Sequence, residues 1–171
     1  MSTVALVTPE EYLATSYRPD RDLVDGMLVE RNVGNKDHSN LQAEVLAWFR
    51  ERRRELRLKA FPEQRIRVAT KRFRVPDVCV VSLPEPVEQV FTQPPYISIE
   101  ILSPDDSFPK LQTRLDDYLA MGVPNIWVID PDSRRGWVVT RAGHFEVLDG
   151  VLRSADGSVV MTIADLFQAA E

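Results

Sequence analysis

The sequence contains very little cysteine, because Cys79 is the only one among 171 residues. A single thiol excludes an internal disulfide and a cysteine-rich metal site, and it fits a reducing cytosol. No apolar run approaches the roughly 20 residues that a membrane-spanning helix needs. The opening residues, MSTVALVTPEE, lack the basic and apolar regions of a signal peptide. We therefore expect a cytoplasmic protein that does not enter a membrane.

Positive charge is in the minority, with a net charge of -5, but it is concentrated in one segment. Residues 50–74 contain eleven Lys or Arg against three Glu, a net of +8, so the remaining chain carries -13. One interpretation is a solvated helix end, where basic residues are favoured. The other is a surface that faces phosphates. On the second interpretation, the candidate DNA contacts are Arg52, Arg53, Arg57, Lys59, Lys71 and Arg72.

Length and local patterns predict one domain over residues 1–171 and a mixture of helices and strands. Thr8, Pro9 and Glu11 form the N-cap, first position and capping box of a short helix. Asp25 and Gly26 stand between two apolar runs, which is the signal of a β-hairpin.

Apolar residues at helical spacing predict a long amphipathic helix from about Asp37 to Leu58. The segments RIRVAT and VPDVCVVS read as strands and are expected to be antiparallel neighbours. YISIEIL is apolar enough to be buried on both faces.

The second half of the chain is also expected to contain both helices and strands. A helix is expected to end at Gly122, followed by the strand NIWVID, a β-meander from GWVVTR to GVLRS, and a helix capped by Thr162. The strand–helix–strand unit over residues 96–130 requires a crossover, so two strands must be parallel. We therefore expect an α/β fold with a central mixed sheet flanked by helices.

Two acidic residues lie inside otherwise apolar strands: Asp77 in VPDVCVV and Glu100 in YISIEIL. A buried carboxylate is costly unless it is paired, hydrogen-bonded or bound to a metal ion. Each residue alone could be a salt bridge or a strand end that reaches water. If the strands are neighbours, the two carboxylates could converge and hold Mg²⁺, which needs only one or two of them.

Other polar residues near these strands have competing interpretations. Glu30 ends an apolar strand, and His38 opens the long helix, where a histidine is more often a cap than a catalyst. Asp105 and Asp106 suit a helix N-terminus, where negative charge is favoured.

Lys110 and Arg114 lie four residues apart on the helix that follows Glu100. Either could lean over the sheet toward Glu100 and assist chemistry on a phosphate. Alternatively they form an ordinary helix flank, with Asp117 as the partner of one of them.

Three segments together, VPDVCVV, YISIEILSPDD and LDDYLAMGVPNIWVIDP, resemble the Uma-two family of endonucleases, within the restriction-endonuclease-like or PD-(D/E)XK superfamily. The resemblance covers roughly residues 11–131. It implies a central mixed sheet flanked by helices and Mg²⁺-dependent phosphodiester hydrolysis. By resemblance, Asp77 is the first acid, Glu100 the second, Glu30 the acid before the long helix, and His38 a histidine frequent in the family.

The sequence departs from the superfamily pattern where a lysine is expected after the second acid. Leu102 stands in that place. The family commonly has a lysine four residues before Tyr118, where this chain has Arg114, and a lysine stands one turn earlier at Lys110. Arginine is always protonated, so it can clamp a phosphate but cannot act as a base.

The first functional hypothesis is a DNA endonuclease in which Asp77 and Glu100 hold Mg²⁺ or Mn²⁺. The second is a nuclease-fold protein without catalysis that binds nucleic acid or another partner. A third, an oligomeric scaffold, requires Glu100 to pair with a buried arginine without an opening to solvent. A homodimer is also expected, through an edge strand of the meander that Arg141 and Glu146 could blunt.

Overall fold

The structure is a computed structural model that describes residues 6–32 and 34–168. Over these ranges the helices are α1 (Pro9–Leu13), α2 (Lys36–Glu51), α3 (Arg53–Leu56), α4 (Phe108–Met121) and α5 (Ile163–Gln168). The strands are β1 (Arg21–Val24), β2 (Met27–Glu30), β3 (Leu58–Pro62), β4 (Ile66–Ala69), β5 (Arg72–Arg74), β6 (Val78–Ser82), β7 (Ile97–Ile101), β8 (Asn125–Asp130), β9 (Arg135–Thr140), β10 (Gly143–Glu146), β11 (Val151–Arg153) and β12 (Val160–Thr162).

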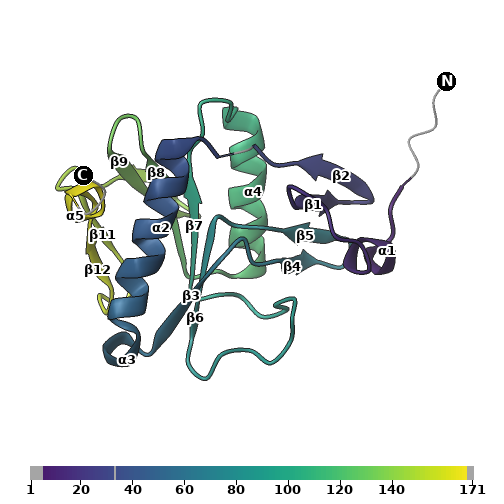
Figure 1. Ribbon diagram of the computed structural model, residues 1–171, viewed down its shortest axis with the longest axis horizontal. Helices are drawn as coiled ribbons and strands as arrows, with labels where there is room; N and C mark the ends of the chain where they lie inside the picture. The colour runs from purple at the N-terminus through teal and green to yellow at the C-terminus, as the bar shows by residue number, and fades with distance from the viewer. Residues whose placement is uncertain (1–5, 33, 169–171) are drawn as a thin grey trace.

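A central sheet of six strands has the order β10-β9-β8-β7-β6-β3. Strands β7 and β8 are parallel with α4 as their crossover, and the other neighbouring pairs are antiparallel. Helices α2 and α4 cover opposite faces of this sheet (Figure 1). The expected α/β architecture, a mixed sheet flanked by helices, is therefore confirmed.

The two faces of the central sheet bury separate apolar cores. On one face, Val45 and Phe49 of α2 pack against Ile99 of β7. On the other, Leu115 of α4 packs with Ile126 of β8. Because β7 is covered on both sides, all five of its residues are buried, the three isoleucines in the core on the α2 side and the polar Ser98 and Glu100 between them in the sequence.

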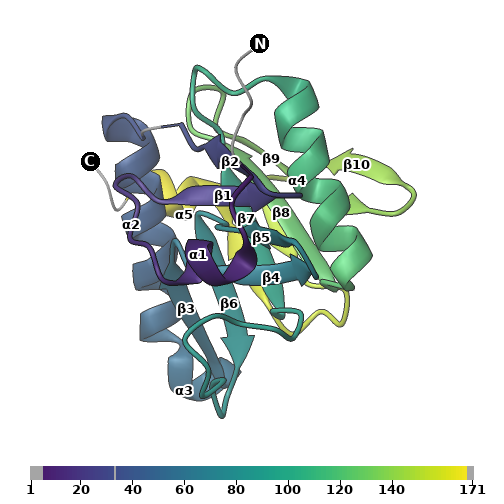
Figure 2. The ribbon, with the colours of Figure 1, turned by 90° about the vertical axis from the view of Figure 1, so that its right-hand side faces the viewer.

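A second sheet, with the order β2-β1-β5-β4, lies on the α4 side of the central sheet. Figure 2 shows this sheet with α1 beside it. The expected hairpin connects β1 and β2, and its turn residues have positive φ angles, 50° at Asp25 and 89° at Gly26. The capping box of Thr8 and Glu11 is also formed, since each residue's side chain accepts a hydrogen bond from the other's backbone N–H.

The predicted helix from Asp37 to Leu58 is too long. Helix α2 ends at Glu51, and the short α3 ends at Leu56, where its C-cap Arg57 has a left-handed φ of 53°. From Leu58 the chain forms β3, which pairs with β6. Helical spacing of apolar residues does not reveal this change, because β3 exists through hydrogen bonds to a strand distant in sequence.

Two predicted strand pairings are also wrong, because local patterns do not show which distant strands pair. RIRVAT contains β4, which pairs with β5 in the second sheet, whereas VPDVCVVS contains β6, which lies between β7 and β3. The third strand of the predicted meander, β11, leaves the central sheet and pairs with β12. Thr162 is the last residue of β12, and residues 169 and 170 of the predicted closing helix lie outside the described residues.

None of the helices in the described part of the chain combines the length and apolar character needed to cross a bilayer.

Candidate active site

Asp77 and Glu100 come together because their strands are antiparallel neighbours. Val78 of β6 pairs with Ile99 of β7, so the same register places Asp77 beside Glu100. Both residues line one small cavity of about 20 Å³, which has room for about one water molecule. Its other lining residues are Arg31, Asn32, His38, Ile101, Ser103, Asp106 and Arg114.

Asp77 is 6% exposed, and both of its carboxylate oxygens have partners. Oδ1 accepts a hydrogen bond of 2.9 Å from Nη2 of Arg31, and Oδ2 accepts one of 2.8 Å from the backbone N–H of Ile101. Nε2 of His38 lies 3.4 Å from Oδ2. Burial opposes ionisation, but the His38 contact, the Arg31 charge and the Ile101 N–H together hold the pKa of Asp77 below its usual value.

Glu100 is 3% exposed and has a different environment. The Tyr118 hydroxyl donates a hydrogen bond of 2.6 Å to Oε1, and Nε of Arg114 lies 3.1 Å from Oε2. Burial raises the pKa of Glu100 to about 7, although the positive charge of Arg114 acts in the opposite direction. The two neighbouring acids are therefore shifted in opposite directions.

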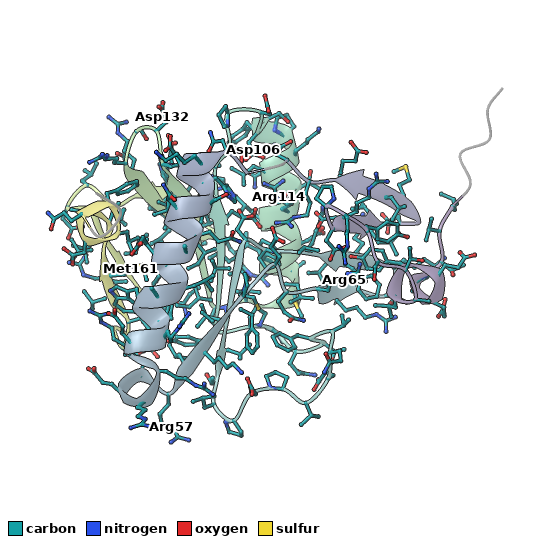
Figure 3. The ribbon with its side chains drawn as sticks, viewed as in Figure 1. Arg57, Arg65, Asp106, Arg114, Asp132 and Met161 are labelled. Carbon is teal, nitrogen blue, oxygen red and sulfur yellow. The ribbon has the colours of Figure 1, made fainter. Side chains whose placement is uncertain are left out.

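Asp106 contacts both Arg114 and Asn32 at the cavity, and Figure 3 shows the labelled Asp106 and Arg114 near one another. Oδ1 of Asp106 accepts hydrogen bonds from Nη2 of Arg114 at 3.3 Å and from Nδ2 of Asn32 at 3.0 Å. Its Oδ2 accepts the backbone N–H of Ser103 at 2.8 Å. Helix α4 begins only at Phe108, so Asp106 lies in the turn before the helix and faces the cavity.

His38 reaches Asp77 from the first turn of α2. The side chain of Asn35 caps this helix by accepting the backbone N–H of His38 at 3.0 Å. The ring lies close to the chain that enters the helix: a Cβ on Gly34 would lie 2.6 Å from Nδ1 of His38. Burial opposes protonation of the imidazole, but Asp77 outweighs it and raises the pKa of His38.

Glu30 and Lys110 lie outside this cluster. The Glu30 side chain is 79% exposed and pairs with Arg21 at 3.1 Å. Lys110 is exposed on α4. Both line an adjacent cavity of about 190 Å³ between the β1–β2 hairpin and α4, and Asn32 and Arg114 line both cavities.

The six candidate DNA contacts form two groups, and none of them lines the cavity of the acidic pair. Arg52, Arg53, Arg57 and Lys59 lie around the end of α2 opposite His38, and Figure 3 shows Arg57 far from Asp106. A helix of 16 residues is about 24 Å long. The second group, Lys71 and Arg72, lies at the β4–β5 turn.

Some of these basic side chains already have acidic partners. Lys59 pairs with Glu85. Arg72 pairs with Asp25 and, at 2.9 Å, with Oδ1 of Asp117. The basic residues of α3, Arg53 and Arg54, are both exposed.

Sequence reasoning did not find Arg31, Asn32 or the polar role of Tyr118. Tyr118 has helical spacing with the core residues of α4, so its hydroxyl contact with Glu100 has no local signal. Arg31 and Asn32 follow β2 and meet the acids only through the tertiary fold.

The side chains around the cavity can be compared with what a divalent cation requires. The two carboxylates of Asp77 and Glu100 are suitable donors for Mg²⁺ or Mn²⁺, with waters completing the shell. Within residues 6–32 and 34–168, however, no three acidic, histidine or cysteine side chains form a ready metal cage. The guanidinium groups of Arg31 and Arg114 contact the two acids instead. The carboxylates are therefore ligands of the type that a divalent cation prefers, and the two guanidinium groups compete with that cation for them.

Comparison with known proteins supports the same family. No curated protein matches the chain. A solved structure described as a "putative nuclease belonging to DUF820", from Anabaena variabilis ATCC 29413, is similar with a TM-score of 0.81 and 24% identity, covering 96% of this chain and 99% of that chain. At this identity the likeness shows a shared fold. A family model, Uma2, described as "Putative restriction endonuclease", matches residues 9–165. The chain therefore belongs to the Uma2 family.

Proposed function

We propose that the protein is a metal-dependent endonuclease that hydrolyses phosphodiester bonds in DNA. The observation that carries this proposal is the convergence of Asp77, Glu100, His38 and Arg114 on one cavity. Membership of a family described as a restriction endonuclease supports it. The opposite pKa shifts of the two acids add support, because such pairs are typical of acid–base sites.

The residues of the cavity have distinct roles in this proposal. Asp77 and Glu100 would hold Mg²⁺ or Mn²⁺, which supplies a bound water of lowered pKa and an electrophile for the phosphate oxygens. Tyr118 fixes the orientation of Glu100 through its hydrogen bond. His38 orients the Asp77 carboxylate, since its Nε2 lies 3.4 Å from Oδ2 of that residue.

Arg114 is the better candidate than Lys110 for the scissile phosphate. Its guanidinium lies between Glu100 and Asp106 at the cavity, and it remains charged throughout the physiological range. Lys110 and Glu30 border the adjacent cavity, where they would contact substrate next to the scissile bond.

The basic residues at the end of α2 are proposed to hold the DNA backbone away from the site. Arg52, Arg53, Arg57 and Lys59 would make sequence-independent contacts that weaken with salt, and Lys71 and Arg72 would do the same at the β4–β5 turn. A cytoplasmic location and a homodimer belong to the same proposal. The exposed edge strand β10 is the proposed dimer contact, although Glu146 on it pairs with Arg135 at 3.5 Å.

One observation favours a second candidate function: Asp77 and Glu100 are each already paired with an arginine. Arg31 pairs with Asp77 and Arg114 with Glu100, as in a nuclease-fold protein that binds nucleic acid without cleaving it. The scaffold hypothesis requires a Glu100–arginine pair closed off from solvent, whereas this pair borders a cavity. Titration with Mn²⁺ separates the candidates, because only the endonuclease requires metal binding.

The test of the proposed function is plasmid cleavage with Mg²⁺ or Mn²⁺ by wild type, Asp77→Asn and Glu100→Gln. Each variant keeps the shape of the side chain and removes its charge. We expect each to lose about 100-fold or more in rate, the scale typical for removal of a group that stabilises a transition state. Circular dichroism checks that each variant is folded. Equal rates in all three proteins would contradict the proposal.

The same assay decides between the two basic residues of α4. Arg114→Gln is expected to lose about 100-fold in rate, whereas Lys110→Gln loses less than about tenfold. Arg114→Lys keeps a cation at the cavity and is expected to keep most of the rate. If Lys110→Gln is the more damaging change, the roles assigned to these two residues are reversed.

A further inference from the structure

Arg31 has contacts that suggest a specific role beside Asp77. It directly follows β2, and its side chain is 12% exposed. Nη2 lies 2.9 Å from Oδ1 of Asp77, and Nη1 lies 3.5 Å from Oε1 of Glu63. Glu63 is 54% exposed, so Arg31 bridges a buried acid and an acid at the surface.

A divalent cation on Asp77 cannot share the position of this guanidinium. Oδ2 of Asp77 already accepts the Ile101 N–H and faces His38, so Oδ1 is the oxygen that a metal ion would take. That oxygen is the one bound to Arg31. The cavity of about 20 Å³ has room for about one water molecule, so with Arg31 in place it cannot hold a cation together with the several waters that complete its coordination shell.

The charges around the cavity also favour a metal ion that replaces Arg31 over one that binds beside it. Arg31 and Arg114 contribute +2, and Asp77, Glu100 and Asp106 contribute -3 when all three are ionised, as they would be as metal ligands or ion-pair partners, so the lining carries -1 with His38 neutral. Without Arg31 the lining carries -2, which one divalent cation neutralises. With Arg31 retained, the same cation would leave a buried net charge of +1, which is unfavourable in a poorly solvated site.

Arg31 and Arg114 differ in how firmly they are held. Arg114 lies between Glu100 and Asp106, both of which line the cavity. The outer partner of Arg31 is the exposed Glu63, so Arg31 can leave Asp77 and keep an ion pair at the surface. Of the two arginines, Arg31 is therefore the one that can leave its acid when a metal ion binds.

We propose that Arg31 occupies the position of the divalent cation in the metal-free protein and releases Asp77 to the metal ion by moving toward Glu63. Arg31 thus sets the metal affinity of the site and stabilises the buried acid while no metal is bound. This inference rests on the proposed function, since it assumes that Asp77 is a metal ligand.

The test is calorimetric titration of the full chain with Mn²⁺, together with the shift in Tm that Mn²⁺ produces. Arg31→Gln is expected to bind Mn²⁺ about tenfold more tightly than wild type, or better, because the competing cation is gone. Its Tm should be lower without metal and should rise more than that of wild type when Mn²⁺ is added. A purely structural role would lower the Tm without this enhanced rescue.

Two further variants make the test specific. Arg65→Gln is the matched control: its guanidinium pairs with Asp20, and its side chain is 16% exposed. Its Mn²⁺ affinity should equal that of wild type. Glu63→Gln changes an exposed side chain, so it keeps the test valid even if Arg31→Gln does not fold. It removes the outer partner of the displaced arginine and is expected to weaken Mn²⁺ binding severalfold.

The outcomes separate this inference from the proposed function. Equal Mn²⁺ affinity in wild type, Arg31→Gln and Glu63→Gln overturns the exchange, even if wild type cleaves DNA. Tighter binding by Arg31→Gln without cleavage by any variant supports the exchange and removes the nuclease function. An absence of Mn²⁺ binding in every variant overturns both.

Discussion

At the scale of single residues, Asp77 and Glu100 show how two adjacent acids acquire different properties. Both are almost fully buried, but Asp77 accepts hydrogen bonds from Arg31 and the Ile101 N–H, and its pKa is lowered. Burial dominates at Glu100 and raises its pKa to about 7. One acid therefore stays ionised while the other changes its protonation near neutral pH.

The raised pKa of Glu100 predicts a pH dependence of stability. Its usual value is 4.5, so the folded chain binds this proton more tightly than the unfolded chain. The stabilisation is complete below about pH 4.5 and is lost as the pH rises to about 7, a change of at most about 3 kcal/mol. Urea denaturation across this range should show the decline in wild type and a flatter profile in Glu100→Gln.

His38 changes stability in the same direction but in a higher window. Its pKa is raised in the folded chain, so its contribution is complete below its unfolded value and is lost only above it. Glu100→Gln should therefore retain the part of the decline that lies above about pH 6.5. A wild-type profile that stays flat from pH 4.5 to 7 would contradict the shift assigned to Glu100.

At the scale of elements, α4 connects the cavity to both sheets. Its apolar face packs on the central sheet, while Arg114 and Tyr118 reach Glu100. Asp117 lies on the side of the second sheet, where its Oδ2 accepts a hydrogen bond of 2.7 Å from Nε of Arg74 in β5. Arg74 also contacts Oδ2 of Asp22 in β1 at 2.9 Å. This chain of buried ions ties α4 to the second sheet.

Breaking this connection is expected to be costly. Asp117→Asn leaves Arg74 with one compensating charge instead of two and should lower the free energy of unfolding by about 3 kcal/mol. Urea denaturation measures the loss. The control is Asp149→Asn, which breaks an exposed pair with Arg153 and should leave the midpoint nearly unchanged. Similar midpoints for both variants would show that the buried ions do not hold α4.

At the scale of the whole molecule, opposite charges are separated in space. The acids that face the cavity lie near the start of α2, and the basic residues 50–59 lie around its other end. A long polyanion that reaches both places must extend along α2. This arrangement suits a nucleic-acid backbone better than a small phosphate ester.

The salt dependence of DNA binding tests this arrangement. Arg53→Gln combined with Arg57→Gln should reduce the slope of log K against log salt concentration by about 0.9 for each lost phosphate contact. Fluorescence anisotropy with duplex DNA measures it. Arg141→Gln is the control, since Arg141 lies in the β9–β10 turn, and β10 is at the opposite edge of the central sheet from β3. An unchanged slope in the double variant would remove the basic end of α2 from the DNA interface.

The sequence by itself determined the elements whose causes are local. The capping box of Thr8 and Glu11, the Asp25–Gly26 turn, and the end of α4 at Gly122 with its φ of 92° all depend on neighbouring residues. The strand β7 was also predictable, because its β-branched isoleucines recur at every second residue, which is the period of a strand. From these elements, the parallel pair β7–β8 followed through the crossover rule.

Only the tertiary structure decided which distant segments meet. Strand β3 was not predicted, and its first residue, Leu58, was placed at the end of a helix, because its pairing with β6 has no local signal. Arg31 and Asn32 became cavity residues through contacts across the sheet, and Arg114 rather than Lys110 reached Glu100. The physical reason is that short-range patterns report burial and backbone preference. Ion pairs between segments depend on strand register and helix rotation, which exist only in the folded chain.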